Sequence, residues 1–163
     1  MKKTILCIFL FAVSAFAAEL DKSQLDLFKK ESTALRGAID DIMNTTVAGR
    51  GVMESSKATY LEGYGAVLTL EASLEPPRNP FTSPKTPAEV RTIVNDRRKA
   101  IETKITNLLK DRVGKMDSIA PTDSVTVVVY LFNSNPADVP DLPSQLVFTV
   151  KKQDPTHVVT RPF

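Results

Sequence analysis

Hydrophobic residues recur along this chain with two different periods, which predicts both helices and strands. Over residues 24–43 the apolar positions are three, four or seven residues apart, as on one face of a helix. The face consists of Leu25, Phe28, Leu35, Ile39 and Ile42, with Ser32 in the remaining place. Because the face is narrow and heptad-like, we expect this helix to pack on a sheet or on its own copy in a dimer.

A second helix is predicted from Thr86 to about Met116. Its start is a capping box, Thr86-Pro87-Ala88-Glu89, with proline at the first helical position. Apolar residues then follow one side of the helix: Val90, Ile93, Val94, Ile101, Ile105, Leu108, Leu109 and Val113. This side is expected to face the core.

The middle of the chain has the pattern of a β-hairpin. Residues 66–75 alternate between apolar and polar, which predicts a half-buried strand. Gly63 and Gly65 come just before it and indicate a bulge or a tight turn. We expect this turn to pair the strand with residues 55–61 as a short hairpin.

Two more strands are predicted in the C-terminal part of the chain. Residues 124–132 are apolar at both parities, which predicts a central strand buried on two faces. Residues 145–152 carry Leu146, Phe148 and Val150 on one side and are expected at an edge of the sheet. These two strands should form a hairpin with a long loop.

Together these elements predict a single α+β domain over residues 18–163, in the order α-β-α-β-β. The expected sheet is small and mixed, with three to four strands packed with two long helices. Residues 75–87 form a proline-rich loop with one apolar side chain, Phe81, and a flexible tail begins at about residue 154. A strand buried on two faces needs two covering layers. Either one helix covers each face, or both helices cover one face and a partner covers the other.

The first 17 residues have the layout of a secretory signal peptide. Lys2 and Lys3 precede an apolar run over residues 4–16, and Ala15-Phe16-Ala17 supplies the small residues of a cleavage site. We expect cleavage after about Ala17 and a periplasmic or secreted protein with no stable membrane span afterwards. An uncleaved signal anchor is the alternative, although the apolar run is shorter than the roughly 20 residues of an ordinary spanning helix.

Removal of this leader changes both the cysteine content and the charge. The only cysteine, Cys7, leaves with it, so the mature chain has no disulfide and no thiol for catalysis or metal binding. The whole chain has 21 basic and 19 acidic residues; without Lys2 and Lys3 the balance is 19 to 19. A neutral chain has no long-range attraction for nucleic acid, so we expect no nucleic-acid partner.

The stretch Tyr60–Glu71 resembles a group of uncharacterised exported bacterial proteins. In that group a Y-L-x-G-Y-G motif likewise opens an alternating strand after an N-terminal helix. The similarity extends to residues 124–130 and 145–152 and so covers most of the mature chain. It implies one exported α+β domain and carries no activity with it.

Patterns for catalysis, metals or cofactors are weak in this sequence. The single histidine, His157, lies in the predicted tail, and Ser55-Ser56-Lys57 are neighbours in a strand whose side chains point to opposite faces. The Asn- and Asp-containing loop over residues 133–141 lacks the spacing and the glycine of a calcium loop. We therefore predict no catalytic residue, no metal site and no cofactor, and regard an enzyme as the less favoured reading.

Three aromatic residues are the candidates for a ligand or partner surface: Tyr60, Tyr64 and Phe81. Both tyrosines share the parity of Leu68 and Leu70, so packing in the core is the alternative for them. We expect a non-catalytic protein-interaction or structural module whose partner is a second copy in a homodimer or another envelope protein. The rival hypothesis is a small-ligand-binding protein or a hydrolase-like enzyme that uses Ser, Lys and Tyr groups.

Overall fold

The protein is a two-layer α+β structure with two long helices and a five-stranded mixed sheet. The computed structural model describes residues 22–47, 52–77, 81, 83–134 and 136–163. The elements in chain order are α1 (Lys22–Thr46), β1 (Val52–Leu61), β2 (Gly65–Ala72), α2 (Pro87–Arg112), a 3₁₀ turn (Val113–Lys115), β3 (Ser124–Leu131), β4 (Gln145–Lys151) and β5 (Asp154–Pro162). The predicted signal peptide lies outside the described residues.

The strands lie in the order β1-β2-β3-β4-β5. The pair β2–β3 is parallel, and the other three neighbouring pairs are antiparallel. The helix α2 connects the two parallel strands, as such a crossover requires. The predicted hairpin of β1 with β2 and the predicted pairing of β3 with β4 are both confirmed.

The predicted number of three to four strands and the predicted order α-β-α-β-β were both wrong. Two strands, β1 and β2, precede α2, and residues 154–162 form β5 instead of a flexible tail, so the order is α-β-β-α-β-β-β. The segment has a short β-branched run at Val158-Val159-Thr160, which is typical of a strand. Pro155 and Pro162 lie on either side of this run and argue against a strand. Prolines are tolerated in an edge strand, where one side of the backbone has no ladder partner. The strand β4, predicted at an edge, is therefore internal and pairs with both β3 and β5.

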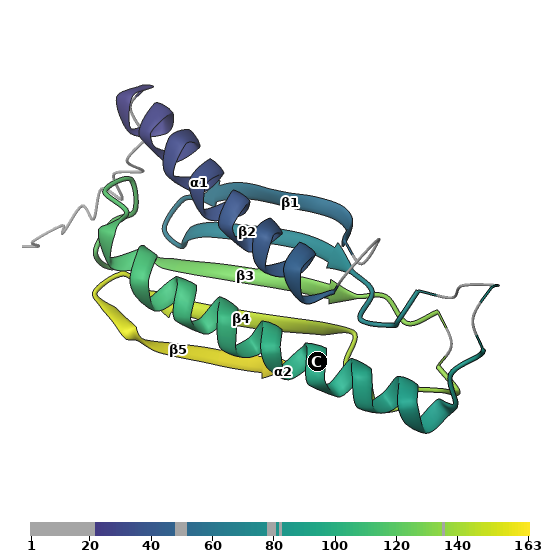
Figure 1. Ribbon diagram of the computed structural model, residues 1–163. Coiled ribbons are helices and arrows are strands. Elements are labelled where there is room, and N and C mark those ends of the chain that lie inside the picture. Colours follow the sequence, from purple (N-terminus) through teal and green to yellow (C-terminus); the bar gives the residue numbers. More distant parts are fainter. Residues whose placement is uncertain (1–21, 48–51, 78–80, 82, 135) are drawn as a thin grey trace, which may run out of the picture.

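Both helices lie on the same face of the sheet (Figure 1). The first, α1, packs on β1 and on α2, and α2 packs on β4 and β5. Of the two arrangements considered from the sequence, the structure therefore has both helices on one face. Within the described residues no helix covers the opposite face, which we call the open face.

The core fills the space between the helices and the inner face of the sheet. Each internal strand contributes alternate residues to it: Ala66, Leu68, Leu70 and Ala72 from β2, Val125, Val127, Val129 and Leu131 from β3, and Leu146, Phe148 and Val150 from β4. The helices contribute Phe28, Leu35, Ile39 and Met43 from α1, and Val90, Val94, Ile101, Ile105 and Leu109 from α2. The apolar faces predicted for the two helices are thus largely confirmed.

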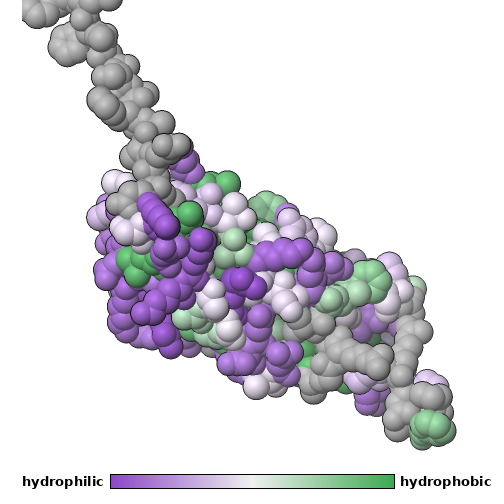
Figure 2. Space-filling view, turned by 90° about the horizontal axis from the view of Figure 1, so that it is seen from above, coloured by the Kyte–Doolittle hydropathy of each residue, from purple (hydrophilic) through white to green (hydrophobic). Residues whose placement is uncertain are grey.

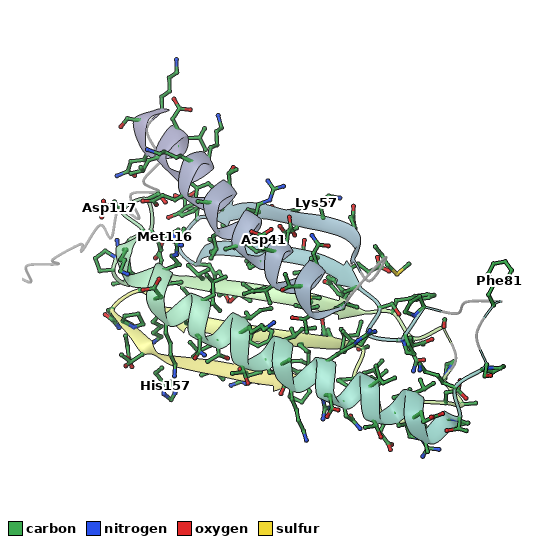
Figure 3. The ribbon with its side chains drawn as sticks, in the orientation of Figure 1. Asp41, Lys57, Phe81, Met116, Asp117 and His157 are labelled. Carbon is green, nitrogen blue, oxygen red and sulfur yellow. The ribbon has the colours of Figure 1, made fainter. Side chains whose placement is uncertain are left out.

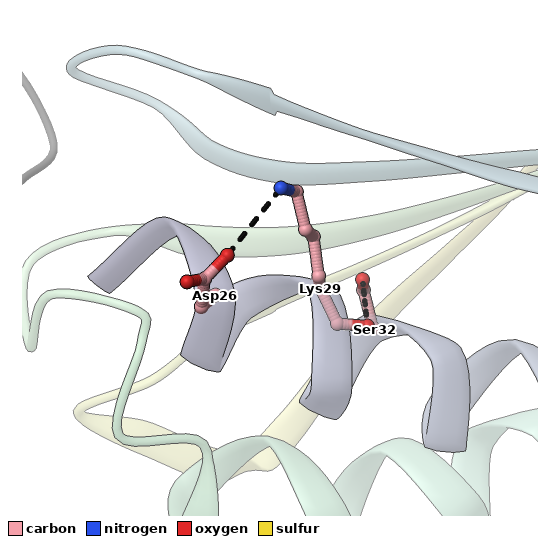
Figure 4. A network of polar contacts seen from close by, with 3 residues as sticks. All are labelled: Asp26, Lys29 and Ser32. Carbon is pink, nitrogen blue, oxygen red and sulfur yellow. Dashed lines mark hydrogen bonds and ion pairs between the residues drawn. The ribbon is translucent and has the colours of Figure 1, made fainter. Parts of the chain in front are cut away.

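One polar residue lies within the buried stripe of α1. The hydroxyl of Ser32 donates to the carbonyl of Lys29 at 3.3 Å, so the buried group is satisfied within its own helix. On the exposed side, Lys29 also forms an ion pair with Asp26 at 3.4 Å (Figure 4). The pair is solvated and contributes little to stability; its position marks the outer side of the helix.

The predicted capping box at the start of α2 is confirmed. The backbone N–H of Thr86 donates to the Glu89 carboxylate at 2.7 Å, and the N–H of Glu89 donates back to the Thr86 hydroxyl at 3.3 Å. About two turns further along the helix, the Arg97 guanidinium donates to the carbonyls of Leu74 and Glu75 at 3.0 and 2.9 Å. These bonds attach the N-terminal part of α2 to the segment that follows β2.

No helix in the described part of the chain has both the length and the apolar run that crossing a membrane needs. In a view from above, hydrophilic residues predominate on the described surface, with smaller hydrophobic areas between them (Figure 2).

Candidate functional site

The turn between β1 and β2 places the two candidate tyrosines on opposite faces of the sheet. Gly63 and Gly65 both have positive φ, of 71° and 113°, and the N–H of Tyr64 donates to the carbonyl of Leu61 at 3.1 Å. The chain therefore reverses between the tyrosines, and the shared parity expected from the sequence was wrong. The parity argument counted straight through Gly63 and Gly65, although the same glycines had also indicated a turn.

Tyr60 lies on the helix-covered face. It is opposite Ala66 in the hairpin, and its ring makes an edge-to-face contact with Phe28, with 5.5 Å between the ring centroids. Its hydroxyl donates to Asp123 Oδ2 at 3.0 Å. Burial, together with the hydrogen bond to Asp123 and its negative charge, raises the pKa of Tyr60. Tyr60 is thus partly buried and helps to attach α1 and the segment before β3 to the hairpin.

Tyr64 lies on the open face. Its hydroxyl is 2.6 Å from that of Thr126, which is in turn 3.1 Å from the hydroxyl of Thr149. Thr126 alternates with the core residues Val125 and Val127, so it points away from the helices. The exposed Tyr64 ring therefore covers part of the open face near the start of β3.

The centre of the open face consists of threonine and valine side chains. The strand register aligns them in two adjacent rows. One row is Thr59, Val67, Thr126, Thr149 and Val159, and the other, between Lys57 and Arg161, is Thr69, Val128 and Val147. Valines 67, 128, 147 and 159 are all partly exposed.

Charged residues surround this uncharged centre. Lys57 and Arg161 stand at the two ends of one row, and Glu71 and Lys151 lie further along the strands. Lys57 is paired with Glu54 on the same strand. An apolar and hydroxyl-bearing centre with a charged rim is the composition found in protein–protein interfaces.

At one end the open face carries three exposed aromatic rings, which we call the aromatic ledge: Tyr130, Phe132 and Phe163. Their exposed fractions are 49%, 44% and 58%. Tyr130 is opposite Gln145, and Gln145 exchanges two backbone hydrogen bonds with Phe163, so all three side chains share one face. Phe132 follows Tyr130 on the same face by strand alternation.

Sequence reasoning missed this ledge because it read residues 124–132 as buried on two faces. Thr126 is buried, but Val128 is partly exposed and Tyr130 is exposed, so the second face is only partly covered. The signal was present in the sequence, since Tyr130 and Phe132 have the same parity as Thr126, the polar member of the run.

Phe81, the third candidate, lies apart from both tyrosines. It is 93% exposed in the segment between β2 and α2, and its side chain projects from the body of the molecule (Figure 3). At the base of this segment Glu75 accepts a hydrogen bond from the backbone N–H of Ser134 at 2.8 Å. Because Ser134 follows β3, the segment begins at the end of the sheet that carries the aromatic ledge.

A carboxylate at the opposite end of the molecule holds α1 to the loop before β3. One oxygen of Glu31 accepts from the N–H of Asp117 at 2.9 Å, and the other accepts from the N–H and the hydroxyl of Ser118 at 3.0 and 2.5 Å. Burial raises the pKa of Glu31, but these hydrogen bonds and the charge of Lys152 outweigh it, so the pKa is lowered overall.

The groups considered for catalysis from the sequence are not brought together. The hydroxyl of the buried Ser56 donates to the carbonyl of Arg36 at 3.4 Å, whereas Lys57 is paired with Glu54. His157 is exposed on β5 (Figure 3). Among the described residues no group of three or more His, Cys, Asp or Glu side chains could hold a metal ion.

Both edges of the sheet carry features that oppose the addition of another strand. The register of β1 with β2 shifts twice, between Val52 and Lys57, and β5 begins with a register shift and ends with Pro162. Bulges and edge prolines both interrupt the row of backbone groups that a new strand would need. The two edges are therefore poorly suited to the addition of a strand from another chain.

Comparison with protein-family models, with curated proteins and with solved structures finds no match to this chain.

Proposed function

We propose that this protein is a non-catalytic protein-interaction module that works outside the cytoplasm and binds its partner through the open face of the sheet. The observation that carries the proposal is the position of the two helices, which cover one face and leave the other with partly exposed valines and exposed aromatics. An enzyme would need convergent polar groups in a concave site, whereas the open face is a sheet surface with an uncharged centre.

The composition of the face supports a protein partner in particular. Its centre has apolar groups to bury and threonine hydroxyls that can exchange hydrogen bonds, and the charges of both signs at its rim can set orientation. A nucleic-acid surface would instead need a continuous basic patch. The rim has Glu71 as well as Lys151 and Arg161.

Site-specific photo-crosslinking tests this function. A photoreactive residue is placed at Val128 or Val147 on the open face and, as a matched control, at Thr92 or Lys99 on the exposed side of α2. Irradiation of cells that export the protein should give a discrete adduct from the open-face positions and none from the helix positions. Absence of adducts from both faces, or equal adducts from both, would contradict the proposal.

The location outside the cytoplasm rests on the leader over residues 1–17. The mass of the protein recovered after export should correspond to a chain that begins near Ala18. Recovery of the chain from the cytosol with Met1 or Lys2 at its start would overturn the location, the cysteine-free state and the neutral charge together.

A further inference from the structure

The spacing of two rings on the aromatic ledge matches the repeat of a polyproline II helix. Neighbouring strands are about 4.8 Å apart, so Tyr130 and Phe163, which are separated by β4, project about 9.6 Å apart. A polyproline II helix repeats every three residues, or about 9.3 Å. Two rings at this spacing can therefore contact successive turns of one polyproline II segment.

The chemistry of the ledge also suits such a segment. A polyproline II helix has no internal hydrogen bonds, so its carbonyls need donors from the surface that binds it. Between the two rings lies the partly exposed Gln145, whose amide can donate, and Tyr130 carries a hydroxyl. Aromatic grooves that bind proline-rich segments combine these same two elements, flat rings and a few donors.

This chain contains a segment of the required type. Residues 76–85, which precede the cap of α2, include prolines at 76, 77, 80 and 84, and their charged residues, Arg78 and Lys85, are both basic. The acidic Glu71 is the direct cross-strand neighbour of Tyr130 on the open face. The segment and the border of the ledge are therefore complementary in charge as well as in spacing.

We propose that the proline-rich segment of one copy binds the aromatic ledge of a second copy. The Phe81 side chain is 93% exposed and projects away from the body of its own molecule (Figure 3), where a second copy can contact it. The segment and the ledge lie at the same end of the sheet, because Glu75 bonds to Ser134 just beyond β3. Two copies can thus exchange segments reciprocally, which gives a closed two-fold dimer. This inference rests on the proposed function, since it names the partner of the open face.

Three variants test the proposal on protein purified after export. The ledge variant is Tyr130→Ser with Phe163→Ser, and the segment variant is Phe81→Ser with Pro84→Ala. The control is Leu61→Ser, which removes a similarly exposed apolar side chain, at 46% exposure, from the last residue of β1, at the end of the open face away from the ledge. All five positions are exposed, so these substitutions should leave the fold intact.

Sedimentation velocity over a range of concentrations should show a monomer–dimer equilibrium for the wild type and for Leu61→Ser. The dimer should weaken at least tenfold in the ledge variant and in the segment variant. A fluorescent peptide of residues 75–87 should bind the wild type and the segment variant, and at least tenfold more weakly the ledge variant. A mixture of the ledge and segment variants should form a heterodimer with one of the two contacts.

A wild type that stays monomeric and does not bind the peptide would overturn this inference. So would a dimer that survives both variants, because the contact would then lie elsewhere. Neither of these two results contradicts the proposed function if photoreactive residues on the open face still crosslink to another protein. If those crosslinks are also absent, both the proposed function and this inference are contradicted.

Discussion

At the scale of single residues, Gly65 holds the hairpin against β3. A Cβ at this position would lie 2.1 Å from the carbonyl oxygen of Ser124, and its φ of +113° is rarely adopted by other residues. We predict that Gly65→Ala lowers the free energy of unfolding by about 3 kcal/mol or more, through backbone strain and the clash together. Gly37, in the interior of α1 with nothing within 4 Å of a Cβ, is the matched control.

Urea unfolding followed by circular dichroism measures both variants. Gly37→Ala should raise the free energy of unfolding by about 0.5–1 kcal/mol, because alanine loses less backbone freedom in a helix. A Gly65→Ala variant as stable as the wild type would show that β2 and β3 do not approach each other closely at Gly65 and Ser124.

A second prediction at this scale concerns Glu31 and acid. Its pKa is lowered from the ordinary value of 4.5, so it stabilises the fold fully above that pH and loses the contribution as the pH falls through the folded-state pKa. Glu31→Gln should cost about 1 kcal/mol at pH 7, a value reduced for the partial exposure of the site. The stability gap between wild type and variant should then narrow below about pH 4.5.

Unfolding midpoints measured between pH 7 and pH 3 test this dependence. The control is Glu62→Gln, at an exposed position in the turn between β1 and β2, for which we expect a much smaller change in stability. A gap for Glu31→Gln that is the same at pH 3 and pH 7 would mean that the ionised carboxylate is not what holds α1 to the loop at Asp117 and Ser118.

At the scale of elements, local signals predicted those structures whose cause is local. The capping box of α2 and the hairpin of β1 with β2 depend on residues a few positions apart, and both could be found from the sequence. The strand β5 could not be predicted, because it is stabilised by pairing with β4, which is not visible in its own sequence. The prolines near its two ends also argued against a strand. Edge strands are defined by their neighbour more than by their own pattern.

The cap of α2 provides a prediction at this scale. Thr86→Ala removes the acceptor for the N–H of Glu89, and we expect a loss of about 1 kcal/mol in the free energy of unfolding. Thr103→Ala, at an exposed position inside the same helix, should be neutral or slightly stabilising, since alanine is the better helix former. Equal effects of the two substitutions in thermal unfolding would contradict a role for the cap.

At the scale of the whole molecule, the position of the helices decided where the candidate site lies. Sequence reasoning identified β3 as central but could not tell whether the helices divide between the two faces, because both arrangements bury the same apolar residues. It selected Tyr60 and Tyr64 as a pair, and they lie on opposite faces. The ledge depends on Phe163 being opposite Gln145, a register that only the complete sheet defines.

The two-layer arrangement can be tested by comparing the stability costs of substitutions at two neighbouring valines on β3. Val127 is fully buried beneath the helices, whereas Val128 is partly exposed on the open face next to Thr69. Val127→Thr places a hydroxyl in the core and should cost about 1–3 kcal/mol. Val128→Thr adds another threonine to a row that already contains one, and should cost less than about 0.5 kcal/mol.

The dependence of these two costs on protein concentration separates the remaining possibilities. In dilute protein, where a dimer is dissociated, chemical unfolding should give a large cost for Val127→Thr alone. Equal costs at every concentration would mean that both faces of β3 are covered within one chain, which contradicts the open face. A cost for Val128→Thr that grows as the concentration rises would instead indicate that a second copy shields the valine centre as well as the aromatic ledge, because mass action stabilises only a face that is buried on association.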